Sequence, residues 1–183
     1  MELEFRDLKA DEIDCRISQI KEKYLDLLLY KDARVDQNIL DETIGSMNWQ
    51  RDHKELKGNI YCGISIYDED KKQWVTKWDC GKESFSEAEK GEASDSFKRA
   101  GFNWGIGREL YTAPQIRIWL SDKDGNDNYS RATKQDGKFT TYTKFYVEKI
   151  EITDKEITGL AIKNNEGKRV FVYIKPKKEV ENG

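Results

Sequence analysis

Two stretches of strict two-residue alternation, joined by a short polar turn, constrain the fold of this chain more than any other feature. The first stretch places four apolar residues on one face, namely Ile60, Cys62, Ile64 and Ile66. This period predicts a strand with one side in a hydrophobic core. Residues 74–80 alternate in the same way after the turn sequence DEDKK, so the two stretches predict an antiparallel hairpin. The segment 48–56, in which Trp49 precedes alternating charged residues, predicts a third strand of the same sheet.

Three other segments show the three- and four-residue spacing of a helical face. Residues 11–30 are predicted to form an amphipathic helix, and residues 35–44 a short helix that ends at Gly45. A capping box formed by Ser86 and Glu89 begins the third segment and predicts a long helix. The apolar face of that helix comprises Ala93, Phe97, Ala100 and Trp104.

The remainder of the chain is predicted to be mainly β-structure. The sequence QIRIWL after Pro114 is a further strand candidate, and the polar stretch 121–138, with two Asp-Gly turns, predicts a loop or the tip of a long hairpin. Three β-rich runs within residues 139–175 are separated by turn sequences and predict a β-meander. Because no linker divides the 183 residues, we expect a single α+β domain spanning residues 1–183.

The charge balance of the chain gives no signature of a strong nucleic-acid binder. Lysine and arginine together number 32 against 35 acidic residues, which leaves a net charge of −3. A local cationic groove is still compatible with this total, because phosphate contacts depend on where the charges lie.

The cysteines and the single histidine exclude the common zinc sites. Cys15, Cys62 and Cys80 have no C-x-x-C spacing, and His53 has no second imidazole to act with it. We expect free thiols in a reducing compartment. No apolar run is long enough to span a membrane, and the segment MELEFRDLKADE lacks the features of a signal peptide, so we expect a cytoplasmic protein.

Motifs for nucleotides, metals and catalysis occur only as incomplete patterns. The segment GFNWGIGR, residues 101–108, lacks the Lys-Ser/Thr of a phosphate-binding loop, and its glycines are predicted to end a helix or to allow close packing. Four alternating residues are similar to the ligands of a calcium loop, namely Asp122, Asp124, Asn126 and Asn128. The glycine and the closing glutamate of such a loop are replaced by Asp127 and Thr133. We therefore expect no metal, no cofactor and no enzymatic activity.

The predicted long helix carries a cationic stripe. Lys90, Ser94 and Lys98 follow one another at four-residue steps, and Arg99 lies beside them. Acidic residues are equally frequent in the surrounding segment, so the pattern alone leaves two interpretations open. The stripe is either a solvated helix face or a contact surface for an anion.

Two continuous strings of this sequence resemble one protein family. Residues 89–111, EKGEASDSFKRAGFNWGIGRELY, resemble the helix signature of the Rad-fifty-two/Rad-twenty-two-type single-strand annealing proteins, particularly their phage and prophage members. Residues 28–52 resemble the family's Tyr-x-x-x-Arg-Val segment, which precedes a Leu-Asp-Glu and a tryptophan. The resemblance covers residues 8–114 and implies a β-β-β-α annealing core, to which residues 115–183 add a β-rich extension.

The resemblance also implies a function. Family members bind single-stranded DNA in a positive groove shared by neighbouring protomers of a ring or open helical arc. They promote ATP-independent annealing of complementary strands in homologous recombination and double-strand break repair. The positions carried over as contacts to DNA phosphates are Arg34, Lys98 and Arg99, with Lys90 as a weaker candidate, whereas Phe102 replaces a cation of the animal members. A host or phage single-strand-binding protein or exonuclease is the implied protein partner.

Two alternatives to annealing remain open. The same groove could serve a single-strand-binding or regulatory module that does not promote pairing. The polar loop 121–138 could instead carry a nuclease or hydrolase site. An annealing assay and a binding assay on the same protein distinguish the first alternative from annealing. Activity that is retained in the presence of a chelator would exclude the second.

Overall fold

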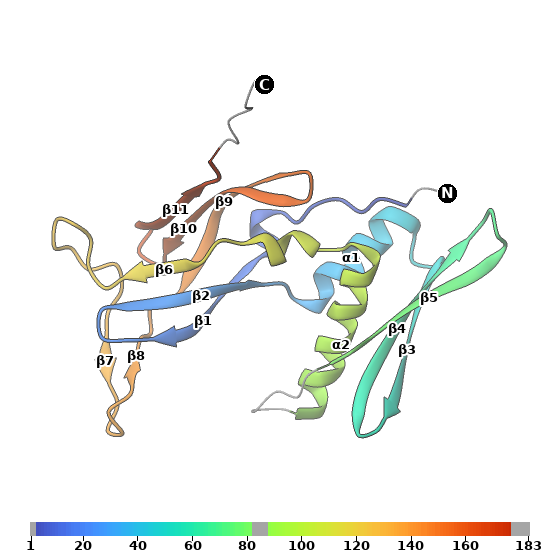
Figure 1. Ribbon diagram of the computed structural model, residues 1–183, viewed down its shortest axis with the longest axis horizontal. Helices are drawn as coiled ribbons and strands as arrows, with labels where there is room; N and C mark the ends of the chain where they lie inside the picture. Colours follow the sequence, from blue (N-terminus) through green and yellow to red (C-terminus); the bar gives the residue numbers. More distant parts are fainter. Residues whose placement is uncertain (1–2, 82–87, 177–183) are drawn as a thin grey trace, which may run out of the picture. The chain divides into compact units, whose positions relative to one another are not determined.

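The computed structural model describes residues 3–81 and 88–176, and the chain divides into two compact units (Figure 1). The first unit comprises Met1–Asp7 and Lys31–Arg108, and the second comprises Leu8–Tyr30 and Glu109–Gly183. Each unit therefore combines segments that are distant in the sequence. The division does not test whether residues 1–183 act as a single annealing domain, which stays a prediction.

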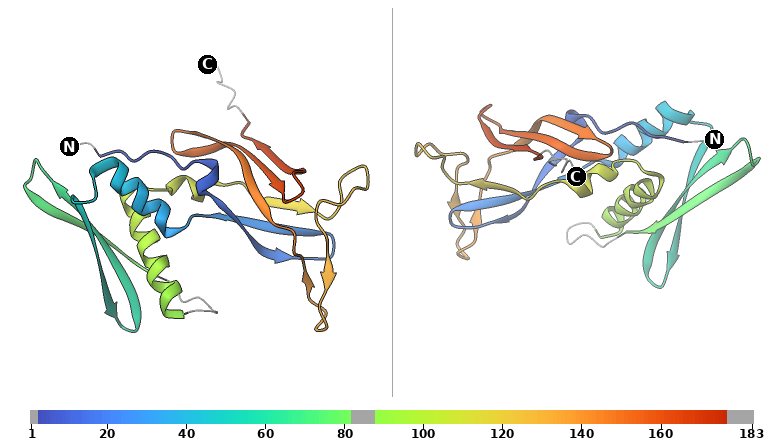
Figure 2. Two further views of the ribbon diagram at one scale, coloured as in Figure 1. Left: turned by 180° about the vertical axis from the view of Figure 1, so that it is seen from behind. Right: turned by 45° about the horizontal axis from the view of Figure 1, so that its top comes forward.

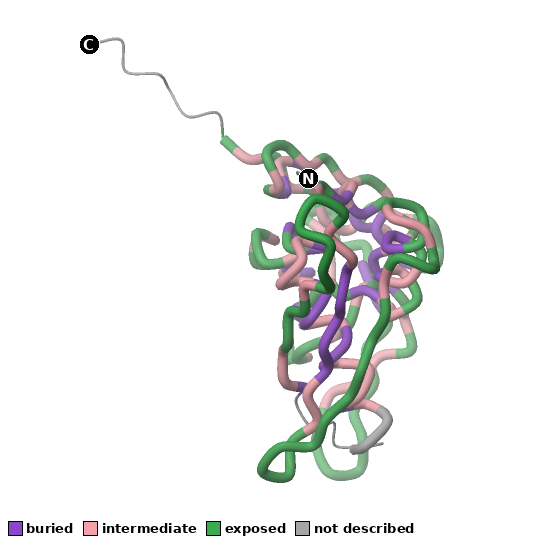
Figure 3. The backbone as a smooth tube through the Cα atoms, turned by 90° about the vertical axis from the view of Figure 1, so that its right-hand side faces the viewer, coloured by how far each residue is buried: buried purple, intermediate pink, exposed green. Residues whose placement is uncertain are grey.

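An antiparallel sheet with the strand order β3-β4-β5 forms one layer of the first unit. Its strands are β3 (Trp49–Leu56), β4 (Asn59–Asp68) and β5 (Gln73–Cys80). The predicted hairpin and the predicted third strand are thus confirmed. The middle strand β4 is buried along much of its length, whereas the two flanking strands are mostly exposed (Figure 3).

The helix α2 (Ala88–Trp104) lies against one face of this sheet. The ring of Phe97 is buried, with its centroid 6.2 Å from that of Trp49, and the indole nitrogen of Trp104 donates to the carbonyl of Ile64 at 2.9 Å. These contacts confirm the predicted long helix and its apolar face. The predicted capping box at Ser86 lies outside the described residues.

The helix α1 (Ala33–Ile44) confirms the predicted short helix and its end at Gly45, although it begins two residues before the predicted start. Gly45 has a φ of 82°, in the left-handed region that glycine adopts at low cost. Beyond the end of α2, Gly105 likewise has a φ of 99°. The glycines near this helix end therefore have the conformational role that the sequence analysis assigned to them.

A six-stranded antiparallel sheet with the order β11-β10-β9-β1-β2-β6 organises the second unit (Figure 2). Its strands are β1 (Asp14–Ile20), β2 (Tyr24–Tyr30), β6 (Ile116–Trp119), β9 (Phe145–Thr153), β10 (Glu156–Asn164) and β11 (Arg169–Ile174). The last three strands are consecutive neighbours, which confirms the predicted meander. The strand β6 confirms the candidate after Pro114.

The predicted helix over residues 11–30 is wrong, because this segment forms the hairpin β1–β2 preceded by a short 3-10 helix, η1 (Ala10–Glu12). In β2, the consecutive residues Leu25, Asp26 and Leu27 are buried, whereas Leu28 is exposed. The register of β1 against β2 shifts between Ile17 and Gln19, at a β-bulge. This bulge interrupts the two-residue period, so the isoleucines of the segment imitate the spacing of a helix.

The polar stretch 121–138 is largely a loop, as predicted, with a short hairpin at its end. A bridge between Ser121 and Asp127 closes its first turn, and β7 (Ala132–Thr133) pairs with β8 (Phe139–Thr140). A second 3-10 helix, η2 (Arg108–Thr112), precedes β6.

The observed elements make this an α+β protein with antiparallel sheets and two α-helices among the described residues. The three cysteines are free, as expected. Within the part of the chain that the structure describes, no helix has the length and apolar character needed to cross a membrane.

Candidate nucleic-acid interface

The first turn of α1 presents an arginine to solvent. Asp32 caps the helix by accepting a hydrogen bond from the backbone N–H of Arg34 at 2.8 Å. The guanidinium of Arg34 also donates to the two carboxylate oxygens of Asp32, at 2.8 and 3.4 Å, and its side chain remains 83% exposed. The hydrogen bonds from Arg34 lower the pKa of Asp32, so the cap is ionised at neutral pH.

The second cation of this region is Lys98 on α2. Its positive charge also lowers the pKa of Asp32, so the ammonium of Lys98 lies close enough to act on the α1 cap. Lys98 is half-buried and forms no ion pair with any described side chain. Arg34 and Lys98 are 64 positions apart in the sequence, yet both lower the pKa of Asp32. The two cations and the one carboxylate together carry an excess positive charge.

A buried ion pair lies where α1 and α2 pack together. Lys31 donates to Asp36 Oδ1, and their side chains are only 1% and 0% exposed. Asp36 Oδ2 has no hydrogen-bond partner, and burial raises the pKa of this carboxyl to about 6 against the opposing charges of Lys31 and Lys98. The Nζ atom of Lys31 lies 4.4 Å from the ring centroid of Phe102. Phe102 stands at the position where the animal members of the family carry a cation, and its ring contacts the ammonium of Lys31.

Gly101 makes this close packing of the two helices possible. A Cβ atom at this position would lie 2.4 Å from Asp36 Oδ1, well inside van der Waals contact. The glycine of the Lys-Arg-Ala-Gly segment is therefore required by the buried carboxylate of the facing helix.

Arg99 is directed toward the sheet. Its Nε atom donates to Asp79 Oδ1 on β5 at 3.2 Å, and Asn103 donates to the other oxygen of Asp79 at 3.3 Å. The side chain of Arg99 is 34% exposed, so part of it remains accessible to an anion. Arg34 therefore bonds to Asp32 and Lys98 acts on the same carboxyl through its charge, while Arg99 bonds to a different acidic residue.

The remaining predicted contact, Lys90, lies in the first turn of α2, but its side chain is outside the described part of the structure.

Two further cations near α2 were missed by the sequence analysis. Lys77 of β5 donates to the carbonyl of Asn103 at 2.9 Å, and Arg108 donates to the same carbonyl at 3.2 Å. The ammonium of Lys77 also lies 4.3 Å from the ring centroid of Trp104, and burial lowers its pKa. Both cations lie at the C-terminal end of α2, where exposed carbonyls favour positive charge. The only signal in the sequence was that Arg108 follows the helix-ending glycines.

The polar loop of the second unit does not resemble an open metal site. Asp122 accepts hydrogen bonds from the backbone N–H groups of Asp124 and Asn126, at 3.0 and 2.8 Å, and from Lys168 Nζ at 2.9 Å. These donors lower the pKa of Asp122 to about 2. No cluster of three or more potential metal-binding side chains occurs among residues 3–81 and 88–176. The carboxylate of Asp122 stabilises the loop itself.

Comparison with known proteins identifies the family. The family model described as Rad52/22 family double-strand break repair protein matches residues 6–129, about two thirds of the chain. No curated protein and no solved structure matches the chain. At the level of the family, this match implies DNA recombination and repair by strand annealing. The chain belongs to the Rad52/22 family of double-strand break repair proteins.

Proposed function

We propose that this protein binds single-stranded DNA and anneals complementary strands without ATP, as a homo-oligomer arranged in a ring or helical arc. The observation that carries the proposal is the convergence of Arg34 and Lys98 on Asp32, within the family match. Two cations around one carboxylate form a surface that attracts a phosphate while needing no base-specific contact. Base pairing itself is favourable, so annealing requires strands to be held and extended rather than an energy source.

The proposed roles of the four predicted contacts differ. Arg34 and Lys98 hold backbone phosphates directly. Arg99 contributes through the exposed part of its side chain while it also bonds to Asp79. Lys90 supplies a weaker contact at the start of α2. The proposed setting is the bacterial cytoplasm, where a host or phage single-strand-binding protein or exonuclease supplies the strands.

The binding test uses a fluorescently labelled oligonucleotide titrated at several salt concentrations. Each phosphate contact to a single strand contributes about 0.7 to the slope of log affinity against log salt. We expect Arg34→Ala and Lys98→Ala each to reduce the slope by about that amount, with any oligonucleotide sequence. Lys123→Ala is the matched control, because Lys123 is an exposed cation of the polar loop, and it should leave the slope unchanged.

The double change Lys98→Ala with Arg99→Ala tests annealing. We expect it to abolish annealing at moderate salt while the oligomer keeps its wild-type mass. If the double variant keeps that mass and anneals normally, the assignment of the DNA site is wrong. A protein that binds the oligonucleotide but never accelerates pairing would instead be the single-strand-binding or regulatory module.

A further inference from the structure

Four aromatic side chains lie on the side of the β3-β4-β5 sheet that faces away from α2. The helix contacts the other side, where Asp79 and Lys77 bond to Arg99 and Asn103. Successive strand residues point to opposite sides, so the odd-numbered residues of β4 and their partners on β5 face away from the helix. We call this group the tryptophan face, and it comprises Tyr61, Tyr67, Trp74 and Trp78.

The tryptophan face is only partly covered by its own chain. Trp74 is 44% and Trp78 is 37% exposed. A Cβ atom at Gly63, opposite Trp78 on β4, would lie 2.6 Å from the indole, so glycine at this position lets the ring rest on the sheet. Trp74 packs edge-on against Tyr67, with the ring centroids 5.4 Å apart. Exposed aromatic groups of this kind mark surfaces that bind another macromolecule.

The charges on this face favour a protein over a nucleic acid. Lys54, whose ammonium lies 4.5 Å from the Trp78 ring centroid, is offset by Asp52 two positions before it on the same side of β3. Single-strand binding on an aromatic platform requires an excess of cations that follows the phosphates. The core of a protein interface instead combines aromatic residues with little net charge.

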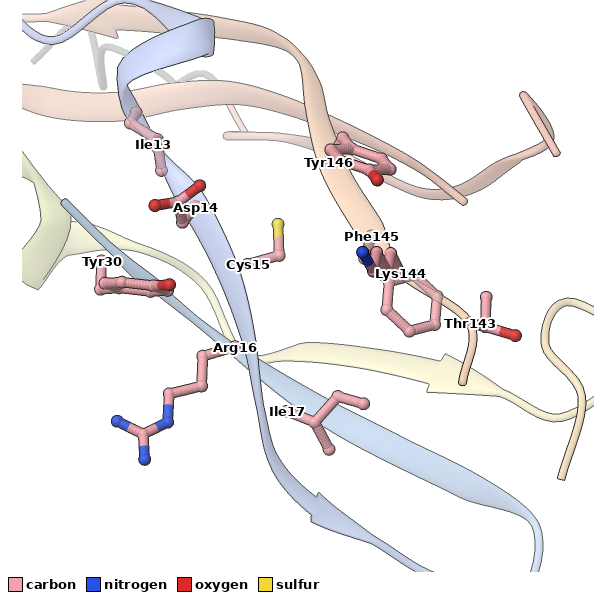
Figure 4. Close-up of a pocket in the computed structure, with 10 residues that line it drawn as sticks. All are labelled: Ile13, Asp14, Cys15, Arg16, Ile17, Tyr30, Thr143, Lys144, Phe145 and Tyr146. Atoms are coloured by element: carbon pink, nitrogen blue, oxygen red, sulfur yellow. The ribbon is translucent and has the colours of Figure 1, made fainter. Parts of the chain in front are cut away.

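The second unit offers a cleft of about 490 Å³ between β1 and the start of β9 (Figure 4). These strands pair at one position, Asp14 with Tyr146, and then diverge. Tyr30 and Tyr146, which are 41% and 46% exposed, line the cleft together with Cys15 and Ile17. A cavity of this size and composition accommodates a large aromatic side chain.

The charges near the two surfaces are complementary. The cleft is lined by Arg16 and Lys144 against one acidic residue, Asp14. The hairpin turn beside Trp74 carries three acidic and two basic residues, namely Asp68, Glu69, Asp70, Lys71 and Lys72. The cleft therefore carries a small net positive charge, and the hairpin turn beside the tryptophan face carries a small net negative charge.

We propose that the tryptophan face of one copy of this chain docks into the β1–β9 cleft of a second copy. The inference rests on the proposed function, which requires an oligomer, and it names the two surfaces that join the protomers. Because the surfaces differ, the contact is head-to-tail and repeats from copy to copy, as a ring or helical arc requires. A self-complementary contact between two tryptophan faces would stop at a dimer.

Two variants that each remove one surface test this arrangement by sedimentation. The first is Trp74→Ser with Trp78→Ser, and the second is Lys144→Glu with Tyr146→Glu. We expect each variant alone to sediment as a single chain of 21.4 kDa. Each variant retains the surface that the other lacks, so an equimolar mixture should form a species of twice that mass and no larger one.

Matched controls change exposed apolar residues outside both surfaces. Met47→Ser in the first unit and Tyr142→Glu in the second should keep the wild-type mass. If the double tryptophan variant fails to fold, Trp74→Glu alone tests the same surface and should also sediment as a single chain. Trp74 is chosen because it is the more exposed of the two tryptophans.

Each of the following results would overturn the inference. Either double variant could keep the wild-type mass, or the mixture could remain at the mass of a single chain. The tryptophan variant could also keep its mass but lose affinity for an oligonucleotide, in which case the face stacks bases. A wild-type protein that is monomeric with and without DNA would overturn the proposed function as well, whereas an oligomeric wild type with unaffected variants overturns only this inference.

Discussion

The two units of this protein place their ion pairs in different environments. In the first unit, the Lys31–Asp36 pair is fully buried where α1 meets α2. In the second unit, the pairs Arg169–Glu148 and Lys168–Asp122 remain partly exposed at the edges of the sheet and loop. Removing one partner of a buried pair leaves the other charge unpaired in apolar surroundings, which lowers stability strongly. Removing one partner of an exposed pair lowers stability little, because water solvates the charge that remains. The second unit also has a partly buried pair, Arg117–Asp26, but the Lys31–Asp36 pair of the first unit is the more deeply buried of the two.

The largest effect is expected from Lys31→Met. The change leaves the Asp36 carboxylate buried without its partner, and we expect the free energy of unfolding to fall by about 3–5 kcal/mol. Urea unfolding at neutral pH measures the loss. The double change Lys31→Met with Asp36→Leu removes both charges and should recover most of the stability. If the Lys31→Met variant is as stable as the wild type, the ion pair does not stabilise the packing of the two helices.

An intermediate effect is expected from pH. Burial raises the pKa of Asp36 from 3.8 to about 6, so the folded state binds a proton more tightly than the unfolded state. The stabilisation from this proton is complete below about pH 4 and is lost as the pH rises through about 6. A shift of this size corresponds to about 3 kcal/mol.

The double variant Lys31→Met with Asp36→Leu supplies the reference for that measurement. Urea unfolding of the wild type and of this double variant at several pH values gives the difference between their free energies of unfolding. We expect this difference to decrease between pH 4 and 6 and then to level off. A difference that stays constant or increases over this range contradicts the assigned direction.

The smallest effect is expected from Lys168→Ala in the second unit. The pKa of Asp122 is lowered to about 2, first by its hydrogen bond from Lys168, so its contribution to stability is present above about pH 4 and disappears as the pH falls toward 2. Removing Lys168 should move the pKa of Asp122 back toward its ordinary value, as NMR titration measures, with little change in Tm at neutral pH. A loss as large as that of Lys31→Met would remove the contrast between the units.

An uninterrupted period made three of the elements predictable from the sequence. The strands β4 and β5 keep a two-residue alternation throughout, and α2 keeps its apolar spacing from Ala93 to Trp104. The hairpin β1–β2 was predicted as a helix because a bulge near Gln19 breaks its period. Its pairing with β6 and β9, which lie far along the chain, has no local signature. The division into two units has the same origin, since each unit joins distant segments.

The sequence pattern alone indicated Lys98 and Arg99 as part of a cationic stripe, but only the family resemblance added Arg34 and assigned these residues to DNA binding. The proximity of Arg34 and Lys98 to Asp32 depends on the packing of α1 against α2. No periodicity distinguishes Lys31 from exposed lysines, so its burial with Asp36 was not predicted. The bond from Arg99 to Asp79 was also missed, because the register of β5 against the helix is set by tertiary packing.

The most direct test of the central claim is an annealing assay on complementary oligonucleotides without ATP and with a chelator present. The wild-type protein should accelerate pairing under these conditions. The variant Arg34→Ala with Lys98→Ala, which removes both cations around Asp32, should keep the wild-type oligomer mass and fail to accelerate pairing at moderate salt. A strict requirement for ATP, or a variant of wild-type mass that anneals as fast as the wild type, would contradict the account.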